Sequence, residues 1–176
     1  MKCRITAVIV LIAASSVWAA PPDSGHPLFL VQHASVQKDL AMTAAQVKAV
    51  EPLVVVDKEA MATLNKTLDA GQMKRLKQIS HRVRGGLALA DEAVSKELGL
   101  TATQTRKIAA IGDDREKDLV MVLQVTRFRD ATAKRKFMLG WRKEVADKML
   151  AELTAEQKTA FEKMQGKKFD TSGVLK

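Results

Sequence analysis

The feature that most constrains this chain is a short motif: an apolar residue, then Thr or Asp, then Gln three residues later. It occurs four times, in Met42–Gln46, Leu68–Gln72, Leu100–Gln104 and Leu153–Gln157. Thr or Asp followed three residues later by Gln is a capping box, in which each side chain bonds the other residue's backbone amide at a helix start. The boxes therefore predict four helix starts, with these cap and partner residues: Thr43 with Gln46, Asp69 with Gln72, Thr101 with Gln104, and Thr154 with Gln157.

The first and third boxes belong to a longer internal repeat. Residues 36–46 and 94–104 share Val, Lys, an acid, Leu, an apolar residue, Thr, Ala and Gln at an offset of 58. A repeat on this scale indicates that one supersecondary unit occurs twice. We expect two half-repeats, at about 36–88 and 91–169, with short helical turns at 35–40 and 91–98 before the first and third boxes.

The apolar spacing and the breakers place the four helices. The first is expected over 43–66, kinked or split at Pro52, and the second over 70–84, ending at Gly85-Gly86. The third is expected over 102–150 as one long helix. Gly112 is a candidate position for a break in this helix, and Gly140 is a candidate position for a bend. The fourth is expected over 155–165. No segment alternates apolar and polar residues, so the prediction is an all-α fold of elongated tandem helical hairpins without a β-sheet.

The N-terminal residues have the pattern of an export signal. Lys2 and Arg4 precede an uncharged apolar run, and small residues lead to a cleavage site after Ala19. We therefore predict a signal peptide over 1–19 and a periplasmic or otherwise extracytoplasmic protein with no integral membrane segment after cleavage. Cleavage removes Cys3, the one cysteine. Residues 20–34 are expected to be a flexible leader, residues 35–170 the helical domain, and residues 171–176 a tail.

Positive charge gathers in two clusters of a chain with 29 Lys and Arg against 20 Asp and Glu. The first consists of Lys74, Arg75, Lys77, His81, Arg82 and Arg84, and the second of Arg127, Arg129, Lys134, Arg135, Lys136, Arg142 and Lys143. Such clusters attract anionic lipid headgroups or acidic unfolded chains, or they are solvated helix faces. Export and the lack of interleaved aromatic residues argue against nucleic acid as a partner.

The predicted third helix also has an apolar face with flexible methionines. Its members, the candidate client-binding face, are Met121, Val125, Phe128, Met138, Trp141, Val145 and Met149. Methionine suits adaptable binding because its side chain is flexible and polarizable. The alternative is that these residues form the ordinary core of a helical bundle.

No residue pattern of catalysis is present in the sequence. The three histidines, His26, His33 and His81, lack the spacing of a metal site, and the adjacent pair Ser80-His81 cannot lie on one face of a helix. The sequence contains no phosphate-binding loop and no nucleophile elbow. We therefore expect no enzyme activity, no metal and no cofactor.

The repeated box in a small exported helical chain without a cysteine after cleavage resembles the Spy/CpxP family of periplasmic proteins. The resemblance spans residues 36–169. In its full layout the chain is also similar to uncharacterised exported bacterial proteins with repeated boxes. It implies a helical hairpin fold, a homodimer in many members, and a role as an ATP-independent chaperone or envelope-stress adaptor for unfolded or partner envelope proteins. Members of the family usually carry two boxes, whereas this chain has four. Two alternatives stay open, a structural adaptor with one dedicated envelope partner and a peripheral binder of anionic envelope surfaces.

Overall fold

The computed structural model describes residues 25–53 and 58–175, and this part of the chain is all-α, with no β-strand. The α-helices are α1 (Pro27–Leu30), α2 (Ala34–Asp39), α3 (Ala44–Val50), α4 (Lys58–Thr67), α5 (Ala70–Arg84), α6 (Glu92–Glu97), α7 (Ala102–Val125), α8 (Ala131–Ala151) and α9 (Ala155–Met164). Two 3-10 helices complete it, η1 (Gly85–Ala90) and η2 (Thr171–Gly173). The predicted all-α class is confirmed. The predicted signal peptide lies outside the described residues.

All four predicted capping boxes are present, at the starts of α3, α5, α7 and α9. The repeat also includes the turn before each of the two boxes at Thr43 and Thr101. There the chain leaves α2 and α6 through Ala41 (φ 49°) and Gly99 (φ 61°), both in the left-handed region. The next residue's amide then donates to a carbonyl five residues back, Met42 to Gln37 and Leu100 to Ser95. This is the Schellman ending of a helix, so each repeat unit consists of a helix end, a tight turn and a capped helix start.

The boxes also pair with one another, which the sequence did not predict. The Gln46 amide nitrogen donates to Gln72 Oε1 at 2.7 Å, and Gln72 Nε2 donates back to Gln46 Oε1 at 3.2 Å. Gln104 and Gln157 form the same reciprocal pair at 2.7 and 3.4 Å. Each glutamine nitrogen also bonds a carbonyl at the turn before its partner's box, for example Gln72 Nε2 to Leu40 O at 3.1 Å. One side chain therefore caps its own helix and fixes it against a second.

This pairing predicts a coupling between two positions that are remote in sequence. Replacing Gln46 and Gln72 by alanine, singly and together, should give losses of unfolding free energy that are non-additive by about 1 kcal/mol, because each single change already breaks the shared bonds. Urea denaturation of the four chains measures this coupling. The control pair is Gln46 with Gln157, which belong to different box pairs. Additive losses at Gln46 and Gln72 would contradict the pairing.

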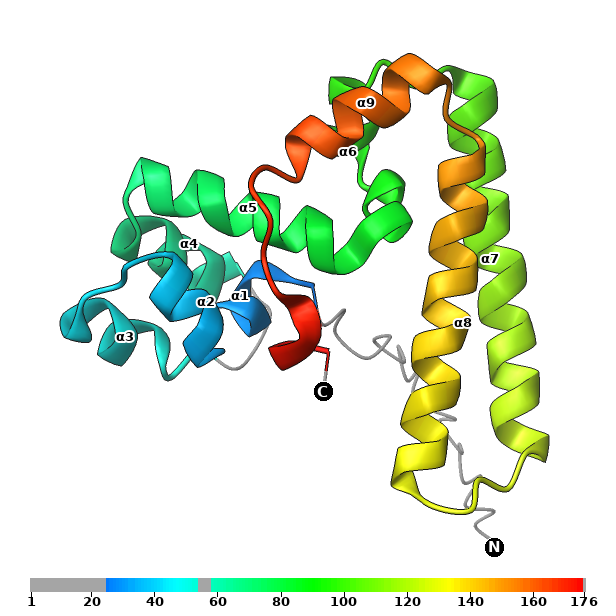
Figure 1. Ribbon diagram of the computed structural model, residues 1–176, viewed down its shortest axis with the longest axis horizontal. Coiled ribbons are helices and arrows are strands. Elements are labelled where there is room, and N and C mark those ends of the chain that lie inside the picture. Colours follow the sequence, from blue (N-terminus) through cyan, green and yellow to red (C-terminus); the bar gives the residue numbers. More distant parts are fainter. Residues whose placement is uncertain (1–24, 54–57, 176) are drawn as a thin grey trace, which may run out of the picture.

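The helices enclose two separate hydrophobic cores. The first contains buried residues of α1 to α5, such as Leu28, Leu64 and Leu76, and the second contains residues of η1 and α6 to α9, such as Ile108 and Phe161. Helix α5 passes from the first core toward the second, and α9 runs back toward α5 from the end of the hairpin where α7 begins and α8 ends (Figure 1). Two segments of the chain therefore connect the cores: α5, and the segment that follows α9.

Two arginines of α5 fasten the returning chain segment. Arg75 is buried and binds Asp39 of α2 at 2.6 Å while donating to the Lys167 carbonyl at 3.0 Å. Arg82 donates to the Gly166 carbonyl at 2.8 Å. Beyond this point the chain enters the first core, where Val174 is only 5% exposed. Segments more than 80 residues apart in sequence are thus held by guanidinium groups.

Helix η1 lies directly against α8, in a contact without free space. A Cβ atom on Gly86 would meet the Ala146 carbonyl oxygen at 2.0 Å and its carbonyl carbon at 2.7 Å. The neighbouring residues Ala88 and Leu89 are buried in the second core. The position therefore requires a residue without a side chain, because two backbones approach each other there.

Several predicted boundaries agree with the structure, and others are wrong. Helix α5 has the predicted ends, and the chain leaves its helical path after Glu51, next to Pro52, as the proline predicted; residues 54–57 of that expected helix lie outside the described part. The flexible leader over 20–34 is wrong from Pro27 on, because α1 buries Leu28 and Leu30. The tail over 171–176 is wrong for Val174, which is also buried.

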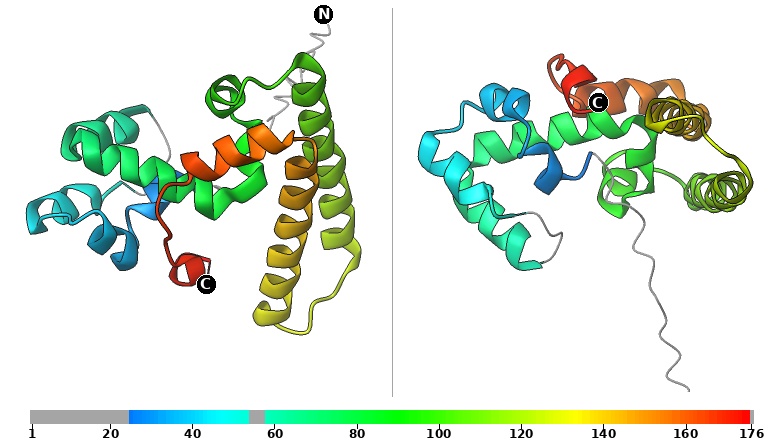
Figure 2. Two further views of the ribbon diagram at one scale, coloured as in Figure 1. Left: turned by 45° about the horizontal axis from the view of Figure 1, so that its top comes forward. Right: turned by 90° about the horizontal axis from the view of Figure 1, so that it is seen from below.

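The single long third helix is wrong as well. The chain turns back between α7 and α8, and the two helices lie side by side as an antiparallel hairpin (Figures 1 and 2). The break lies at residues 126–130 and not at Gly112, which is inside α7, where a Cβ would be in ordinary contact with Met149. The signal for the break is Asp130, whose carboxylate accepts from the Ala133 amide at 2.7 Å and caps α8.

Candidate binding surface

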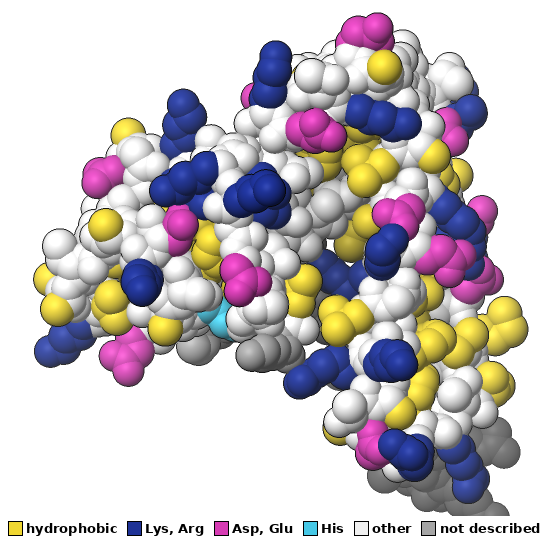
Figure 3. Space-filling model, in the orientation of Figure 1, with side chains coloured by type: hydrophobic (Ala, Val, Ile, Leu, Met, Phe, Trp, Pro, Cys, Tyr) yellow, Lys and Arg dark blue, Asp and Glu magenta, His cyan; other side chains and the backbone are white. Residues whose placement is uncertain are grey.

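The far half of the α7–α8 hairpin carries the most unusual surface of the described chain. All four large hydrophobic side chains that are exposed among the described residues lie there: Val120 (46%), Met121 (59%), Val125 (75%) and Leu139 (37%). Figure 3 shows hydrophobic side chains along this half of the hairpin, with Lys and Arg side chains next to them. Solvent-exposed apolar residues gathered in one place, bordered by charge, are typical of interaction sites.

The exposure arises because the end of α7 is apolar on every side. Six of the seven residues over 119–125 are apolar. Residues at helical spacing from buried Ile108, among them Leu119 and Val122, are half-buried. Val120, Met121 and Val125 lie on the uncovered side, and we call these three residues the α7 patch.

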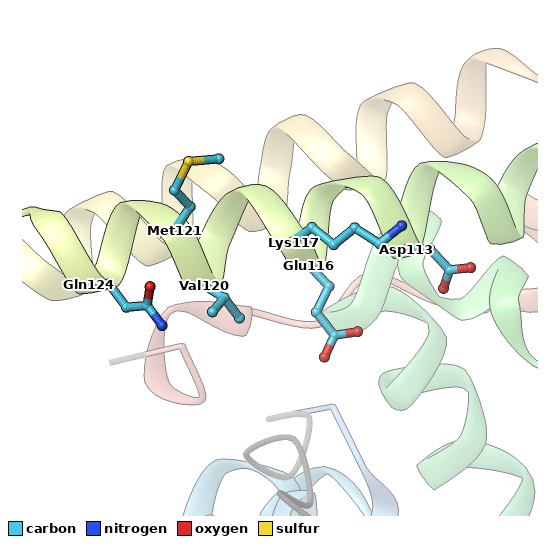
Figure 4. A pocket seen from close by; sticks show the side chains of 6 residues that line it. All are labelled: Asp113, Glu116, Lys117, Val120, Met121 and Gln124. Atoms are coloured by element: carbon cyan, nitrogen blue, oxygen red, sulfur yellow. The ribbon is translucent and has the colours of Figure 1, made fainter.

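A shallow hollow runs along the outer face of α7 next to this patch. Its lining side chains among the described residues come from that helix (Figure 4): Asp113, Glu116, Lys117, Val120, Met121 and Gln124. Met121 extends away from the ribbon, and its flexible thioether can adapt to partners of different shape. The hollow is apolar toward the hairpin end and charged toward the base, so a partner there would meet both kinds of surface.

The structure divides the predicted client-binding face of seven residues. Val145 and Met149 are buried in the second core and Trp141 packs against it, so the alternative of an ordinary bundle core applies to these three. Met121 and Val125 are exposed on α7. The other two, Phe128 in the turn and Met138 on α8, are half-buried, and the Phe128 ring lies 5.3 Å from that of Phe137. The prediction of one continuous face is wrong because it assumed one continuous helix.

Sequence reasoning missed Val120, Leu139 and Phe137. Val120 and Leu139 are off the stripe that a continuous helix would present, and they become surface residues only once the chain folds back. The run Leu119–Leu123, apolar at five consecutive positions, was the available signal. An amphipathic helix leaves polar residues between its apolar ones, whereas this run cannot bury all its side chains on one face.

The two basic clusters differ in what their members contact. In the first cluster Arg75 and Arg82 bind partners within the fold, and Arg84 forms an ion pair with Asp91. Burial lowers the pKa of His81, so its ring tends toward the neutral form. Much of this cluster therefore serves the internal structure.

The second cluster is mostly exposed and surrounds the hairpin turn. Asp130 is the one acid in the sequence between residues 126 and 143, and Lys143 pairs with Asp147 at 2.6 Å. Hydrogen bonds from the Ala133 amide and the Arg129 side chain hold the pKa of Asp130 below its ordinary value, so this carboxylate stays charged. Arg127, Lys134, Arg135 and Lys136 are exposed and have no carboxylate partner among the described residues. The hairpin end thus carries a net positive charge next to exposed apolar side chains.

Within residues 25–53 and 58–175, no group of three or more His, Cys, Asp or Glu is arranged to hold a metal ion. Nor does any helix in these ranges have the length and apolar character needed to cross a membrane. His26 accepts from the Leu28 amide at the start of α1, and Ser80 donates to the Gly25 carbonyl at 2.6 Å. Both contacts are structural.

No family model, no curated protein and no solved structure matches this chain. The surface of the hairpin is therefore the basis for the proposed function.

Proposed function

We propose that this protein is a non-enzymatic, extracytoplasmic binding protein that holds unfolded or partner proteins on the α7 patch, in the manner of a Spy/CpxP-like chaperone or envelope-stress adaptor. The observation that carries the proposal is that the large exposed hydrophobic side chains of the described chain all lie on one hairpin. Apolar surface of this kind gains free energy when a partner removes it from water. The Spy/CpxP resemblance, the repeated capping boxes and the expected export signal support the same proposal.

The shape of the hairpin fits such a role. It extends away from the two cores, so the α7 patch is accessible to a partner without displacement of any core helix (Figure 1). The helix beneath is anchored near its start, by the Thr101 box and by Ile108, which is 1% exposed. A partner would therefore contact flexible side chains on a helix whose start is fixed in the second core. Such an arrangement suits binding to varied partners.

An aggregation assay tests this function. The chain from Ala20, mixed with a denatured client upon dilution, should suppress light scattering. The triple variant Val120→Ser, Met121→Ser, Val125→Ser should need a roughly tenfold higher concentration for half-suppression, because losing ~1.4 kcal/mol of apolar contact weakens binding tenfold. Since the patch is exposed, the variant's unfolding free energy should change little.

The matched control changes three other exposed positions of the same helix. These are Thr103, Ala109 and Ala110, each replaced by serine. The control should suppress aggregation as well as the unmodified chain. Equal suppression by both triple variants would exclude the α7 patch as the binding site. If the unmodified chain suppresses nothing at stoichiometric ratio, the chaperone proposal is wrong, and one dedicated partner becomes the alternative to pursue by co-purification.

A further inference from the structure

We propose that the hairpin tip, residues 126–137, docks on the surface of a bilayer that contains anionic phospholipids. The tip is separate from the α7 patch and consists of the turn after α7 and the first turns of α8. The proposal goes beyond protein binding, because it gives the molecule a second surface with a different ligand.

The tip carries uncompensated positive charge. Arg127, Lys134, Arg135 and Lys136 are exposed, and none forms an ion pair with a described residue. The one acid of the tip, Asp130, already caps α8 and pairs with Arg129. Lys and Arg side chains held near an anionic headgroup layer are attracted to it. The first basic cluster offers no equivalent, because three of its arginines are engaged within the fold.

The expected lack of interleaved aromatic residues is wrong at the tip, where Phe128 lies between Arg127 and Arg129 and Phe137 follows Lys136. Phe128 and Phe137 contact each other and are half-buried. Aromatic rings and long basic side chains together are the residues that favour the headgroup region of a membrane. A purely electrostatic function would not need aromatic side chains at the same end.

The turn is at the free end of the hairpin, farthest from the two cores (Figure 1). Among the described residues, no other helix lies beside α7 and α8 at that end (Figure 1). A flat surface can therefore contact the tip without meeting the rest of the molecule. A protruding end fits a flat bilayer better than it fits an extended peptide, which needs a groove.

Vesicle binding tests the proposal. The chain from Ala20 keeps every described residue and leaves Trp141, next to Phe137 in a shallow hollow of α8, as the one tryptophan. It should co-sediment with phosphatidylcholine vesicles containing a quarter of phosphatidylglycerol, with a change in tryptophan emission, and bind pure phosphatidylcholine much less. Binding should fall as salt is added, because counterions screen exposed charges. Replacing Arg127, Lys134, Arg135 and Lys136 by glutamine should weaken binding at least about tenfold.

The control removes the same charge elsewhere. Lys38, Lys48, Lys66 and Lys158 are exposed and outside the hairpin, and their replacement by glutamine should leave vesicle binding nearly unchanged. An equal loss in both quadruple variants, equal binding to both kinds of vesicle, or no binding would overturn the proposal. A tip variant that loses client suppression while no vesicle is bound would assign the cations to protein binding instead. The serine variant of the α7 patch should still bind vesicles, which separates this proposal from the proposed function.

Discussion

Replacing Gly86 by alanine should lower the unfolding free energy by about 3 kcal/mol, the largest effect expected of a single added methyl group in this chain. The new Cβ would lie 2.0 Å from the Ala146 carbonyl oxygen, and the atoms it meets are backbone, which cannot rotate away. Helix η1 would have to move off α8, which would open the second core at Ala88 and Leu89. Urea denaturation followed by circular dichroism measures the loss.

The same substitution at Gly140 is the control. Gly140 lies inside α8, and a Cβ there would meet nothing within 4 Å. Alanine at this position should stabilise the chain by roughly 0.5–1 kcal/mol, since glycine is the poorer helix former. The two variants should thus shift stability in opposite directions. A neutral Gly86→Ala variant would mean that η1 does not pack against α8 as described.

Replacing Arg75 by methionine should also destabilise the chain by about 3 kcal/mol, because removing one partner of a buried ion pair leaves the other uncompensated. Methionine keeps much of the apolar stem but loses the bonds to Asp39 and to the Lys167 carbonyl. The Asp39 side chain is 21% exposed, so its carboxylate would be only partly rescued by water. Thermal or urea unfolding measures the effect, with the exposed Arg106→Met as the control that should change little.

The pH dependence of this loss identifies its cause. The hydrogen bond from Arg75 holds the pKa of Asp39 below its ordinary value. A carboxyl group whose pKa is lower in the folded state adds stability above its unfolded pKa, about 4, and this stability disappears as pH falls through the folded value. The difference in unfolding free energy between the unmodified chain and Arg75→Met should therefore be largest near neutral pH and become smaller below about pH 4. A gap independent of pH would show that Arg75 acts through packing alone.

The predictable parts of this fold are those encoded within a few residues. A capping box needs only a cap residue and a glutamine three positions later, so all four helix starts could be read from the chain. The pairing of the boxes depends on residues 26 and 53 positions apart, and nothing local distinguishes a glutamine that only caps from one that also pairs. The same holds for Arg75, which belonged to a basic cluster in sequence but is buried in the fold.

The candidate site was predicted in part for a related reason. Met121 and Val125 were recognised as apolar residues of a helix, and they are exposed as a binding face requires. Val145 and Met149 have the same character but lie in the core. Which residues become surface was decided by the turn at 126–130, and its signal was a single aspartate cap without the glutamine of the other boxes. Because this local signal is weaker than a capping box, the arrangement of the hairpin could not be predicted from the sequence.

The burial of Val174 in the first core has a consequence for the order in which the molecule can assemble. The other buried members of that core lie between residues 28 and 83, so they leave a ribosome or a translocation channel well before this one does. Until residues 167–175 arrive, Arg75 lacks the Lys167 carbonyl and the core lacks Val174 and part of its cover from Phe169. The half of the protein that is made first is thus finished last, and it remains open to partners, proteases and misfolding while the second half is being synthesised.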